Sequence, residues 1–478
     1  MNDPFYQALA FVGSGCLYIF LIIFSFRASS KIHYSGYLLL FPLFGAALVE
    51  TALIFTAPAA LSRDIPAYIA IGHAGKSYYV YGFFNPPAPV SPVLYGPPWA
   101  AIASAITATG SQHLATATAL FRGLALLAHL INTLLIWAIL GKIAPANRLP
   151  GTLLYAWNPL VLVELAINGN ASGVVLCCLL LAVWLFIQRK GRWSDTGALV
   201  LLGLAGSMNL LVLLLAPLFL WFIVRDARDT TKALLRFAWR ALVMLAIIVA
   251  AYIPVWQGGT TFLAITASLN LSSFVYSPLA LIVIPVRALY SLVAQGAHLP
   301  PSLMQPSSAA GATVLASLFF LFALLYFREM GRVGDESYPT GVNLTDREMG
   351  PIDASHPPPR ARACPRPGRE ERVIPAIETL FTSWSIVIIG YITLVSTVFW
   401  PWYVVWVVGV VALRRFDTLS MCAVLLSCSA LLYYPLQLVD PTQASVLSPL
   451  CIFGIPLVYV IVKRCIPVRR VERNKVTV

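Results

Sequence analysis

Apolar runs of about 20 residues recur from residue 5 to residue 462, and short polar segments separate them. A helix of this length spans the hydrocarbon core of a bilayer. The pattern predicts an all-α polytopic membrane protein with about 13 transmembrane helices, within a range of roughly 11 to 14. The expected spans are 5–26, 37–60, 116–140, 150–168, 172–188, two short helices that turn near Met208 within 197–224, 241–257, 309–327, 376–397, 400–413, 418–436 and 446–462.

Basic residues indicate on which side of the membrane each loop lies. Of the 32 Lys and Arg residues, 28 occur in seven segments that alternate with the apolar runs. Cytosolic loops are enriched in Lys and Arg, so we expect an external N-terminus and a cytosolic C-terminus. The segments are 27–36, 141–149, 189–196, 225–240, 328–375, 414–417 and 463–478.

This topology divides the chain into six parts. A large external loop at 61–115 is expected to carry short interfacial or re-entrant helices, one of them at 94–110. A second external loop is expected at 258–308. Residues 328–375 are rich in Pro, Arg and Glu, which predicts a disordered cytosolic loop. The parts are the N-terminal spans 1–60, the first external loop 61–115, the core 116–327, the cytosolic loop 328–375, the C-terminal spans 376–462 and the basic tail 463–478.

Composition narrows the class of protein further. Hydrophobic residues make up 59% of the chain and charged residues only 11%, whereas soluble domains carry about 25% charged residues. A soluble enzyme, a disordered protein and a protein with a single membrane anchor are therefore excluded. The net charge of +13 lies mainly in the cytosolic segments, so we expect contacts with membrane lipids and none with nucleic acid. The eight cysteines are scattered and no dense His or carboxylate group faces outward, so no metal or other cofactor is expected.

Asp64 is the most informative of the few charged residues outside the cytosolic segments. It stands just past the outer end of the second span, and Tyr68 and His73 follow it on the same short helix. A carboxylate at the lipid–water boundary suits a general base whose substrate is part lipid and part polar. Its neighbour Arg63 is expected to favour the ionised form of the carboxylate. The alternative is that Asp64 caps the N-terminus of a short helix.

Charged and polar residues within the spans form a second group. Arg122 and His129 share one helix face, and an Arg on a polar face suits a phosphate. A buried pair of Arg122 with Glu50 or Glu164 is the alternative. Glu164 and Asn168 lie one turn apart, where they either bind sugar hydroxyls or hold helices together.

Aromatic residues gather in the first loop and again near residue 400. Tyr95 and Trp99 belong to the first cluster, and Trp402 and Tyr403 belong to the second. Aromatic faces bind sugar rings, but Trp and Tyr are also enriched wherever spans meet the membrane surface. The residues alone leave both interpretations open.

Four motifs carry a resemblance to a known family. Residues 62–72 read SRDIPAYIAIG, and Asn85-Pro86 is followed by YGPPW at 95–99. Residues 157–165 read WNPLVLVEL, and 399–403 read FWPWY. In this order they resemble motifs of the polyprenyl-phosphate-mannose-dependent α-mannosyltransferases of bacterial membranes, which belong to the GT-C class of glycosyltransferases. The likeness covers most of the chain, and the first motif corresponds to the one that holds the catalytic Asp of that class.

The resemblance implies a GT-C-type bundle and an integral membrane glycosyltransferase. Such an enzyme moves a hexose from a polyprenyl-phosphate donor to a glycan or glycolipid acceptor on the outer face of the bacterial cell membrane. Mannose is the hexose that the resemblance leads us to expect. Asp64 would be the general base, and cations would stabilise the leaving lipid phosphate. The phosphate-binding candidates are Arg122, Arg63, Lys76 and Arg287. The sugar or acceptor candidates are Tyr68, His73, Asn85, Tyr95, Trp99, His129, Glu164, Asn168, Trp402 and Tyr403.

The chain departs from the family at three places, which leaves the sugar, the acceptor and the linkage open. Where family members often have His-Asn-Asp, residues 168–173 read NGNASG. Met208 and Asn209 stand where a basic residue is frequent, and the loop is shorter between Asn85 and Tyr95. An inactive GT-C relative is therefore one alternative.

Two further classes of protein stay open. A transporter or lipid flippase would have a central polar cavity lined by Arg122, His129 and Glu164. A membrane scaffold without catalytic activity is the other. The long aromatic loop that carries Asp64 favours the enzyme, as does the lack of paired inverted segments.

Overall fold

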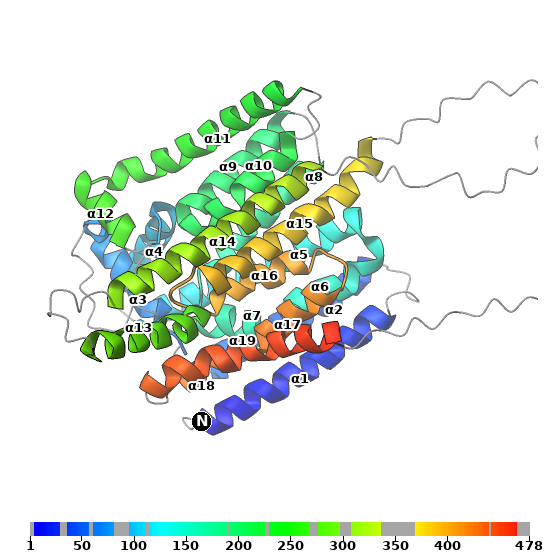
Figure 1. The fold of residues 1–478 in the computed structure, drawn as a ribbon. Coiled ribbons are helices and arrows are strands. Elements are labelled where there is room, and N and C mark those ends of the chain that lie inside the picture. The colour runs from blue at the N-terminus through cyan, green and yellow to red at the C-terminus, as the bar shows by residue number, and fades with distance from the viewer. Residues whose placement is uncertain are drawn as a thin grey trace, which may run out of the picture.

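The structure is a computed structural model, and helices make up nearly all of the residues it describes. Within these residues no β-strand occurs, so the fold class is all-α, as predicted. The long helices lie roughly parallel in a bundle, and shorter helices gather at one end (Figure 1). The described segments are 4–28, 36–56, 61–80, 95–110, 114–188, 192–224, 229–267, 276–296, 307–335, 369–438 and 441–465.

Eight helices in the described segments are long and apolar enough to cross a membrane. The total is nine if the bent pair of α6 (Arg148–Ala156) and α7–η5 (Pro159–Ile167) is one span. Three more apolar helices are shorter, namely α8 (Ser172–Gln188), η6–α10 (Leu210–Val224) and α16 (Trp402–Val411). The protein is thus a multi-span membrane protein, but the predicted total of about 13 spans is not confirmed. The eight long helices are α1 (Pro4–Ala28), α2 (Leu40–Thr56), α5 (Leu114–Ile143), α11 (Thr230–Tyr252), α14 (Ser307–Asp335), α15 (Arg369–Leu394), α17 with α18 (Thr418–Leu436) and α19 (Pro441–Cys465).

The span predicted at 150–168 is not one straight helix. The chain bends by 47° between α6 and α7, where Pro159 is the first helical residue. Proline lacks the N–H that a continuing helix would use. The side chain of Asn158 accepts hydrogen bonds from the backbone N–H groups of Leu160 and Val161 and so caps the new helix. The Trp-Asn-Pro sequence is therefore a helix break.

The turn expected near Met208 is confirmed. Helix α9 (Arg192–Met208) ends there, and η6 begins two residues later. Asn209 stands between them in an extended conformation, and its side chain accepts a hydrogen bond from the backbone N–H of Leu211. The turn therefore has its own capping residue.

The disordered loop predicted at 328–375 is too long at both of its ends. Helix α14 continues through Asp335, and α15 already begins at Arg369; residues 336–368 lie outside the described segments. Glu329 stabilises this extension, because its buried carboxylate accepts a hydrogen bond from Ser383 of α15 and pairs with two arginines of α14.

The two ends of the bundle differ in chemistry. At one end, α1, α5, α14 and α19 each finish on a turn that carries basic residues. We call this the basic end; its residues include Arg27, Lys142, Arg332, Arg414, Arg415, Lys463 and Arg464.

The opposite end, which we call the Asp64 end, carries the helices of the first loop. Helix α3 (Asp64–Ala74) packs against α4 (Pro97–Thr109) so closely that a Cβ added at Gly72 would lie 2.3 Å from the Thr107 Oγ1. The backbone N–H of Gly96 donates to the Met208 carbonyl over 3.0 Å, which fixes α4 to the end of α9. Figure 1 shows α3 and α4 near α12 (Gly259–Ala267), on the left of the bundle. The first loop is thus a structured cover over this end.

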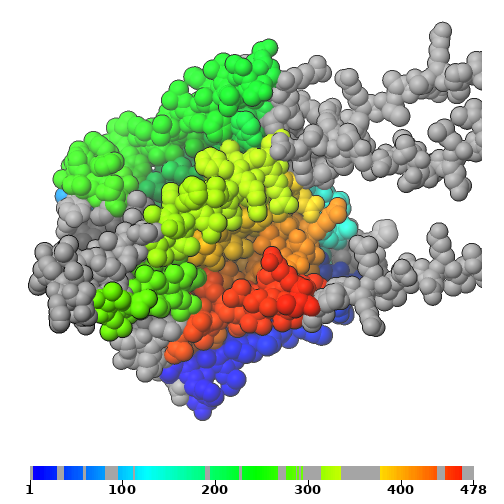
Figure 2. Space-filling view, viewed as in Figure 1, coloured from blue at the N-terminus to red at the C-terminus, as the bar shows by residue number. Residues whose placement is uncertain are grey.

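The outer faces of the bundle are apolar. Figure 2 shows α1 (blue) and α19 (red) side by side on one face, although they lie at opposite ends of the sequence. These two helices carry exposed apolar side chains, among them Phe20 and Phe24 of α1 and Leu457 and Val458 of α19. In water such a surface would be unfavourable, whereas lipid chains solvate it well.

Candidate functional site

Asp64 begins α3, but its side chain does not cap that helix. The N-cap residue is Arg63, and its side chain makes no capping hydrogen bond. The Oδ2 atom of Asp64 accepts hydrogen bonds from Ser62 Oγ over 2.8 Å and from Asn170 Nδ2 over 3.0 Å. The capping alternative is therefore wrong, and Asp64 is instead fixed to a turn more than 100 residues away in sequence.

That turn is formed by Asn168, Gly169 and Asn170, between η5 and α8. Gly169 has φ of +61°, in the left-handed region that favours glycine. A Cβ added at Gly169 would also lie 3.1 Å from the Ile65 side chain, so a larger residue would push α3 away. Asn170 Oδ1 accepts from the Ser172 backbone N–H, which leaves its Nδ2 directed at Asp64. The turn therefore presents an amide donor to the carboxylate.

Asn168 connects the first loop to the interior of the bundle. Its Oδ1 accepts from the Ser62 backbone N–H over 3.1 Å, and its Nδ2 donates to Glu164 Oε2 over 3.2 Å and to the Tyr434 hydroxyl over 2.8 Å. The Tyr434 hydroxyl in turn donates to Glu164 Oε1. Both oxygens of Glu164 are thus occupied, and the residue is only 1% exposed. These contacts favour the helix-packing alternative for Glu164 and Asn168.

The environment of Asp64 raises its proton affinity. Burial raises the pKa of Asp64 above its usual value, and the hydrogen bonds from Ser62 and Asn170 offset only part of this effect. Arg63 is exposed, and in the described part of the chain no ion pair joins it to Asp64. Arg63 is not among the groups that shift the pKa of Asp64, and the net shift is upward because burial dominates. A carboxylate of raised pKa is a stronger base once it is ionised.

A narrow crevice lies beside Asp64. It is lined by Tyr95, Trp99 and Trp402 together with Asn170 and Asn209, and it is too tight to admit a water molecule. Two buried polar atoms of its lining, Trp99 Nε1 and Ser172 Oγ, have no hydrogen-bond partner in the described part of the chain. The crevice thus brings together three of the predicted sugar-binding aromatics, and Asn170, which lines it, also donates a hydrogen bond to Asp64.

Tyr68 packs behind the residues that line this crevice and holds them in place. Its hydroxyl accepts from the Ala171 backbone N–H and donates to the Tyr95 hydroxyl, and its ring meets Trp99 edge-on with centroids 4.8 Å apart. Burial raises the pKa of Tyr68 well above its usual value, so it stays neutral. Its contacts position the aromatic residues and the Asn170 turn.

Arg122 lies behind the Asn168–Asn170 turn and is nearly buried. Its Nε donates to the Ile167 carbonyl over 2.9 Å, and its Nη1 donates to the Ile54 carbonyl over 3.3 Å. The guanidinium therefore joins the ends of η5 and α2. Among the described contacts, neither Glu50 nor Glu164 forms an ion pair with Arg122. The alternative that Arg122 is paired with one of these two acids is therefore wrong.

His129 pairs with Glu50 deep in the bundle. Its Nδ1 lies 2.6 Å from Glu50 Oε1, and both side chains are fully buried. The pair joins α5 to α2 and lies apart from the residues around Asp64, so the structure does not bring His129 to the crevice.

The remaining predicted residues are distributed as follows. His73 is exposed on α3, and Lys76 is exposed on the short helix η3 (Gly75–Tyr79). Tyr403 is buried against Tyr391, with ring centroids 5.9 Å apart. Arg287 lies on α13 (Pro278–Gly296), and Asn85 lies outside the described residues, as does the side chain of Arg287.

Sequence reasoning missed Ser62, Asn170 and Tyr434 as members of the site. Asn170 had a signal, because an Asn after Asn-Gly at the start of a helix is a typical turn and cap residue. Tyr434 had none, since it sits in an apolar run among other aromatics. No group of three or more His, Cys, Asp or Glu residues that could hold a metal occurs among the described residues, and the metal-free reaction stays a prediction.

Comparison with known proteins does not identify a family for this chain. No protein-family model matches the chain, and neither the curated proteins nor the solved structures give a significant match. Fold and site together define an all-α multi-span membrane protein that presents one half-buried carboxylate beside an aromatic crevice.

Proposed function

We propose that the protein is an integral membrane glycosyltransferase. It transfers a hexose, most simply mannose, from a polyprenyl-phosphate donor to a hydroxyl group of a glycan or glycolipid acceptor. The observation that carries this proposal is the carboxylate of Asp64, which is half-buried, held by two neutral donors and adjacent to the aromatic crevice. The four sequence motifs that resemble the mannosyltransferases support the same assignment.

In the proposed reaction Asp64 takes the proton of the acceptor hydroxyl. The acceptor oxygen forms a bond to the anomeric carbon, and the bond between that carbon and the phosphate oxygen breaks. The electron pair leaves with the polyprenyl phosphate. The exposed cations at this end, Arg63 and Lys76, are the nearest candidates in sequence to stabilise the leaving charge. Tyr95, Trp99 and Trp402 would contact the sugar ring once the crevice widens around it.

The proposal includes a topology in which the Asp64 end faces outward and the basic end faces the cytosol. The basic turns at the ends of α1, α5, α14 and α19 support it. The shorter helices α8, α9, η6–α10 and α16 would also cross between their longer neighbours, which gives a total of about 13 spans.

The topology is tested by labelling an introduced cysteine with a membrane-impermeant reagent. The cysteine replaces Ser337 in a chain in which the exposed Cys16 and Cys465, and Cys364 from the same segment as Ser337, are changed to serine. We expect labelling only after the cells are opened. Labelling in intact cells would reverse the topology and place Asp64 on the cytosolic side.

The function is tested with membranes that contain the protein and labelled polyprenyl-phosphate mannose. We expect a labelled glycan or glycolipid from the wild-type protein, and a rate lower by about 10²–10⁴-fold for Asp64→Asn. Asp229→Asn is the matched control, because Asp229 caps α11 by accepting from the Thr231 backbone N–H and Asn caps equally well. A normal rate in folded Asp64→Asn would exclude Asp64 as the base.

The transporter alternative has less support. It requires a central polar cavity lined by Arg122, His129 and Glu164. Each of these side chains instead forms hydrogen bonds with different residues, so the three do not face a shared cavity. A substrate that crosses the membrane in reconstituted vesicles without chemical change would nevertheless favour it over transfer.

A further inference from the structure

A large cavity opens at the basic end, on the other side of the bundle from Asp64. Its volume is about 1110 Å³, and α1, the connection between α5 and α6, α15 and the turn between α16 and α17 form its walls. Binding sites for small molecules typically measure about 300–1,000 Å³. The cavity is therefore large enough for a sizeable ligand, and none of the residues assigned to glycosyl transfer lines it.

The lining of this cavity has an apolar part and a charged part. Phe26 of α1 stacks on Phe416 of the α16–α17 turn, with ring centroids 4.5 Å apart, and Ile23 and Met421 extend the same apolar wall. Next along α1 after Phe26 stands Arg27, which also lines the cavity. An apolar wall that runs along a membrane-spanning helix and ends in a cation fits an amphipathic ligand.

Two arginines supply the positive charge. Arg415 is 81% exposed, and its Nε lies 3.4 Å from Glu378 Oε2. Arg27 is exposed, and within the described part of the chain no carboxylate lies at ion-pair distance from it. Among the described residues of the lining, Arg27 and Arg415 face a single acid, Glu378, which gives this part of the cavity a net positive charge.

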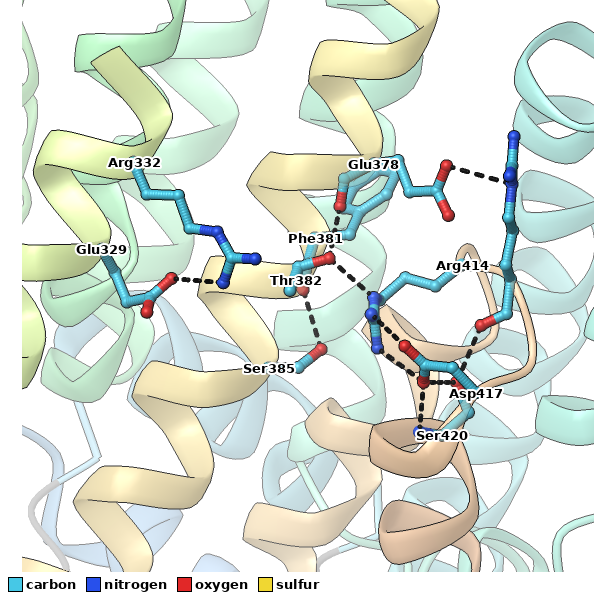
Figure 3. Close-up of polar contacts among 10 residues, drawn as sticks. Glu329, Arg332, Glu378, Phe381, Thr382, Ser385, Arg414, Asp417 and Ser420 are labelled. Atoms are coloured by element: carbon cyan, nitrogen blue, oxygen red, sulfur yellow. Dashed lines mark hydrogen bonds and ion pairs between the residues drawn. The ribbon is translucent and has the colours of Figure 1, made fainter. Parts of the chain in front are cut away.

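The neighbouring Arg414 differs from Arg415, because its guanidinium is bound by other residues of the protein. It is 5% exposed, donates from Nε to the Thr382 hydroxyl and binds Asp417 Oδ2 over 2.9 Å (Figure 3). Its charge is thus neutralised within the protein. Arg415 follows it directly but is mostly exposed and lines the cavity.

We propose that the cavity binds an anionic phospholipid. The phosphate group of the lipid lies between Arg27 and Arg415, and an acyl chain lies along Ile23 and Phe26. Arg is the residue best suited to a phosphate, because its guanidinium presents paired donors. Cytosolic leaflets are rich in anionic lipids, and basic pockets on that side of spanning helices bind their head groups. This site rests on the proposed topology, in which the basic end faces the cytosol, but not on the proposed glycosyl transfer.

The test uses the full-length protein, purified in detergent and stripped of lipid. Dioleoyl-phosphatidylglycerol is added, and bound lipid is measured by native mass spectrometry. We expect saturable binding of one lipid that the double variant Arg27→Gln/Arg415→Gln weakens by about tenfold or more. Arg236→Gln is the matched control, since Arg236 is exposed at the same end of the bundle on α11 and does not line the cavity.

A second variant tests the apolar wall without changing charge. Met421→Trp would fill the part of the cavity beside Phe416 and should weaken lipid binding while leaving the melting temperature close to that of the wild type. If the double variant has a much lower melting temperature than the wild type, the lipid affinity of Met421→Trp still tests whether the cavity is the binding site. Equal binding by Met421→Trp and wild type would overturn the placement of the acyl chain.

Two further arms identify the ligand. Dioleoyl-phosphatidylethanolamine, which is zwitterionic, should bind at least several-fold more weakly than phosphatidylglycerol. Inorganic phosphate at millimolar concentration should not displace the lipid. Equal affinity for both lipids, displacement by phosphate, or an equal loss in Arg236→Gln and the double variant would each overturn the proposal.

Discussion

The Asp64 end and the basic end hold their carboxylates with different partners. At the basic end, Asp417 binds Arg414 over 2.9 Å and Glu329 binds Arg328 over 2.8 Å (Figure 3 shows the first of these pairs). At the Asp64 end, Asp64 and Glu164 accept hydrogen bonds only from neutral amides and hydroxyls among the described contacts. The same acidic groups therefore sit in two electrostatic settings within one bundle.

The difference shows which carboxylates remain able to take a proton. An arginine partner neutralises a carboxylate and favours its charged form, so the acid serves to join helices. Neutral donors orient a carboxylate without cancelling its charge, and burial then makes proton uptake more favourable. The half-buried Asp64 fits this second setting, which suits a base.

The most direct test of this difference between the two ends is to neutralise one carboxylate at each end. We expect Asp64→Asn to lower the transfer rate by about 10²–10⁴-fold with little change in melting temperature. Asp417→Asn should leave transfer nearly unchanged and lower the melting temperature, because it removes the charge that Arg414 binds. Transfer rates and thermal unfolding of both purified variants are the measurements. A similar loss of transfer in both variants would contradict the assignment of roles to the two ends.

Tyr434→Phe tests whether the neutral network positions Asp64. The variant loses the hydroxyl that Glu164 and Asn168 share, which should cost about 1–3 kcal/mol of unfolding free energy. Because Asn168 also holds the backbone of Ser62, we expect transfer to fall by about tenfold through misplacement of Asp64. Tyr459→Phe on α19 is the control. Loss of stability with an unchanged rate per folded molecule would limit Tyr434 to packing.

Arg122→Ala and Arg414→Ala compare the two buried arginines. Arg122→Ala leaves the carbonyls of Ile167 and Ile54 without this donor, which should cost about 1–3 kcal/mol. Arg414→Ala should cost less, up to about 1 kcal/mol, because its partner Asp417 is partly exposed and water can solvate it. Thermal unfolding in detergent measures both. A normal melting temperature with weak use of the lipid donor in Arg122→Ala would instead assign Arg122 to phosphate binding.

Asn170→Ala should produce the smallest effect, a shift in the pH dependence of transfer. The raised pKa of Asp64 means that the rate increases with pH as the carboxylate ionises. Hydrogen bonds from Asn170 favour the ionised form, so their loss should move the acidic limb to higher pH by about one unit or less. Rate–pH profiles measure the shift, with Asn147→Ala at the basic end as the control. A shift to lower pH would contradict the role of Asn170 as a donor to the carboxylate.

Much of the fold could be predicted because membrane spans leave a simple signal. Apolar length predicts the helices, and the turn at Met208 follows from a run too long for one span. The break at Pro159 was also readable, since proline ends a hydrogen-bonding ladder. Asp64 was identifiable as an isolated acid at a loop boundary.

The rest of the site depends on contacts that leave no local pattern. The partners of Arg122 are backbone carbonyls, which every residue has, so no sequence signal marks them. Tyr434 lies 270 residues from Glu164, and only the packing of α18 against the interior brings them together. The direction of the Asp64 pKa was missed for a similar reason, because burial is a property of the folded chain.

The bond between Glu164 and Tyr434 also constrains how the protein is made. A ribosome synthesises Glu164 in the first half of the chain and Tyr434 close to its end. For most of synthesis and insertion, the carboxylate of Glu164 is therefore inside or near the membrane without the hydroxyl that later binds it. Burying an acid whose only early partner is the amide of Asn168 is costly, so we expect Glu164 to stay in contact with water or with the insertion machinery until α18 (Tyr433–Leu436) is in place. Chains truncated before Tyr434 should consequently be targets for quality control, even though Ser62 and Asn170, which donate hydrogen bonds to Asp64, have already been made.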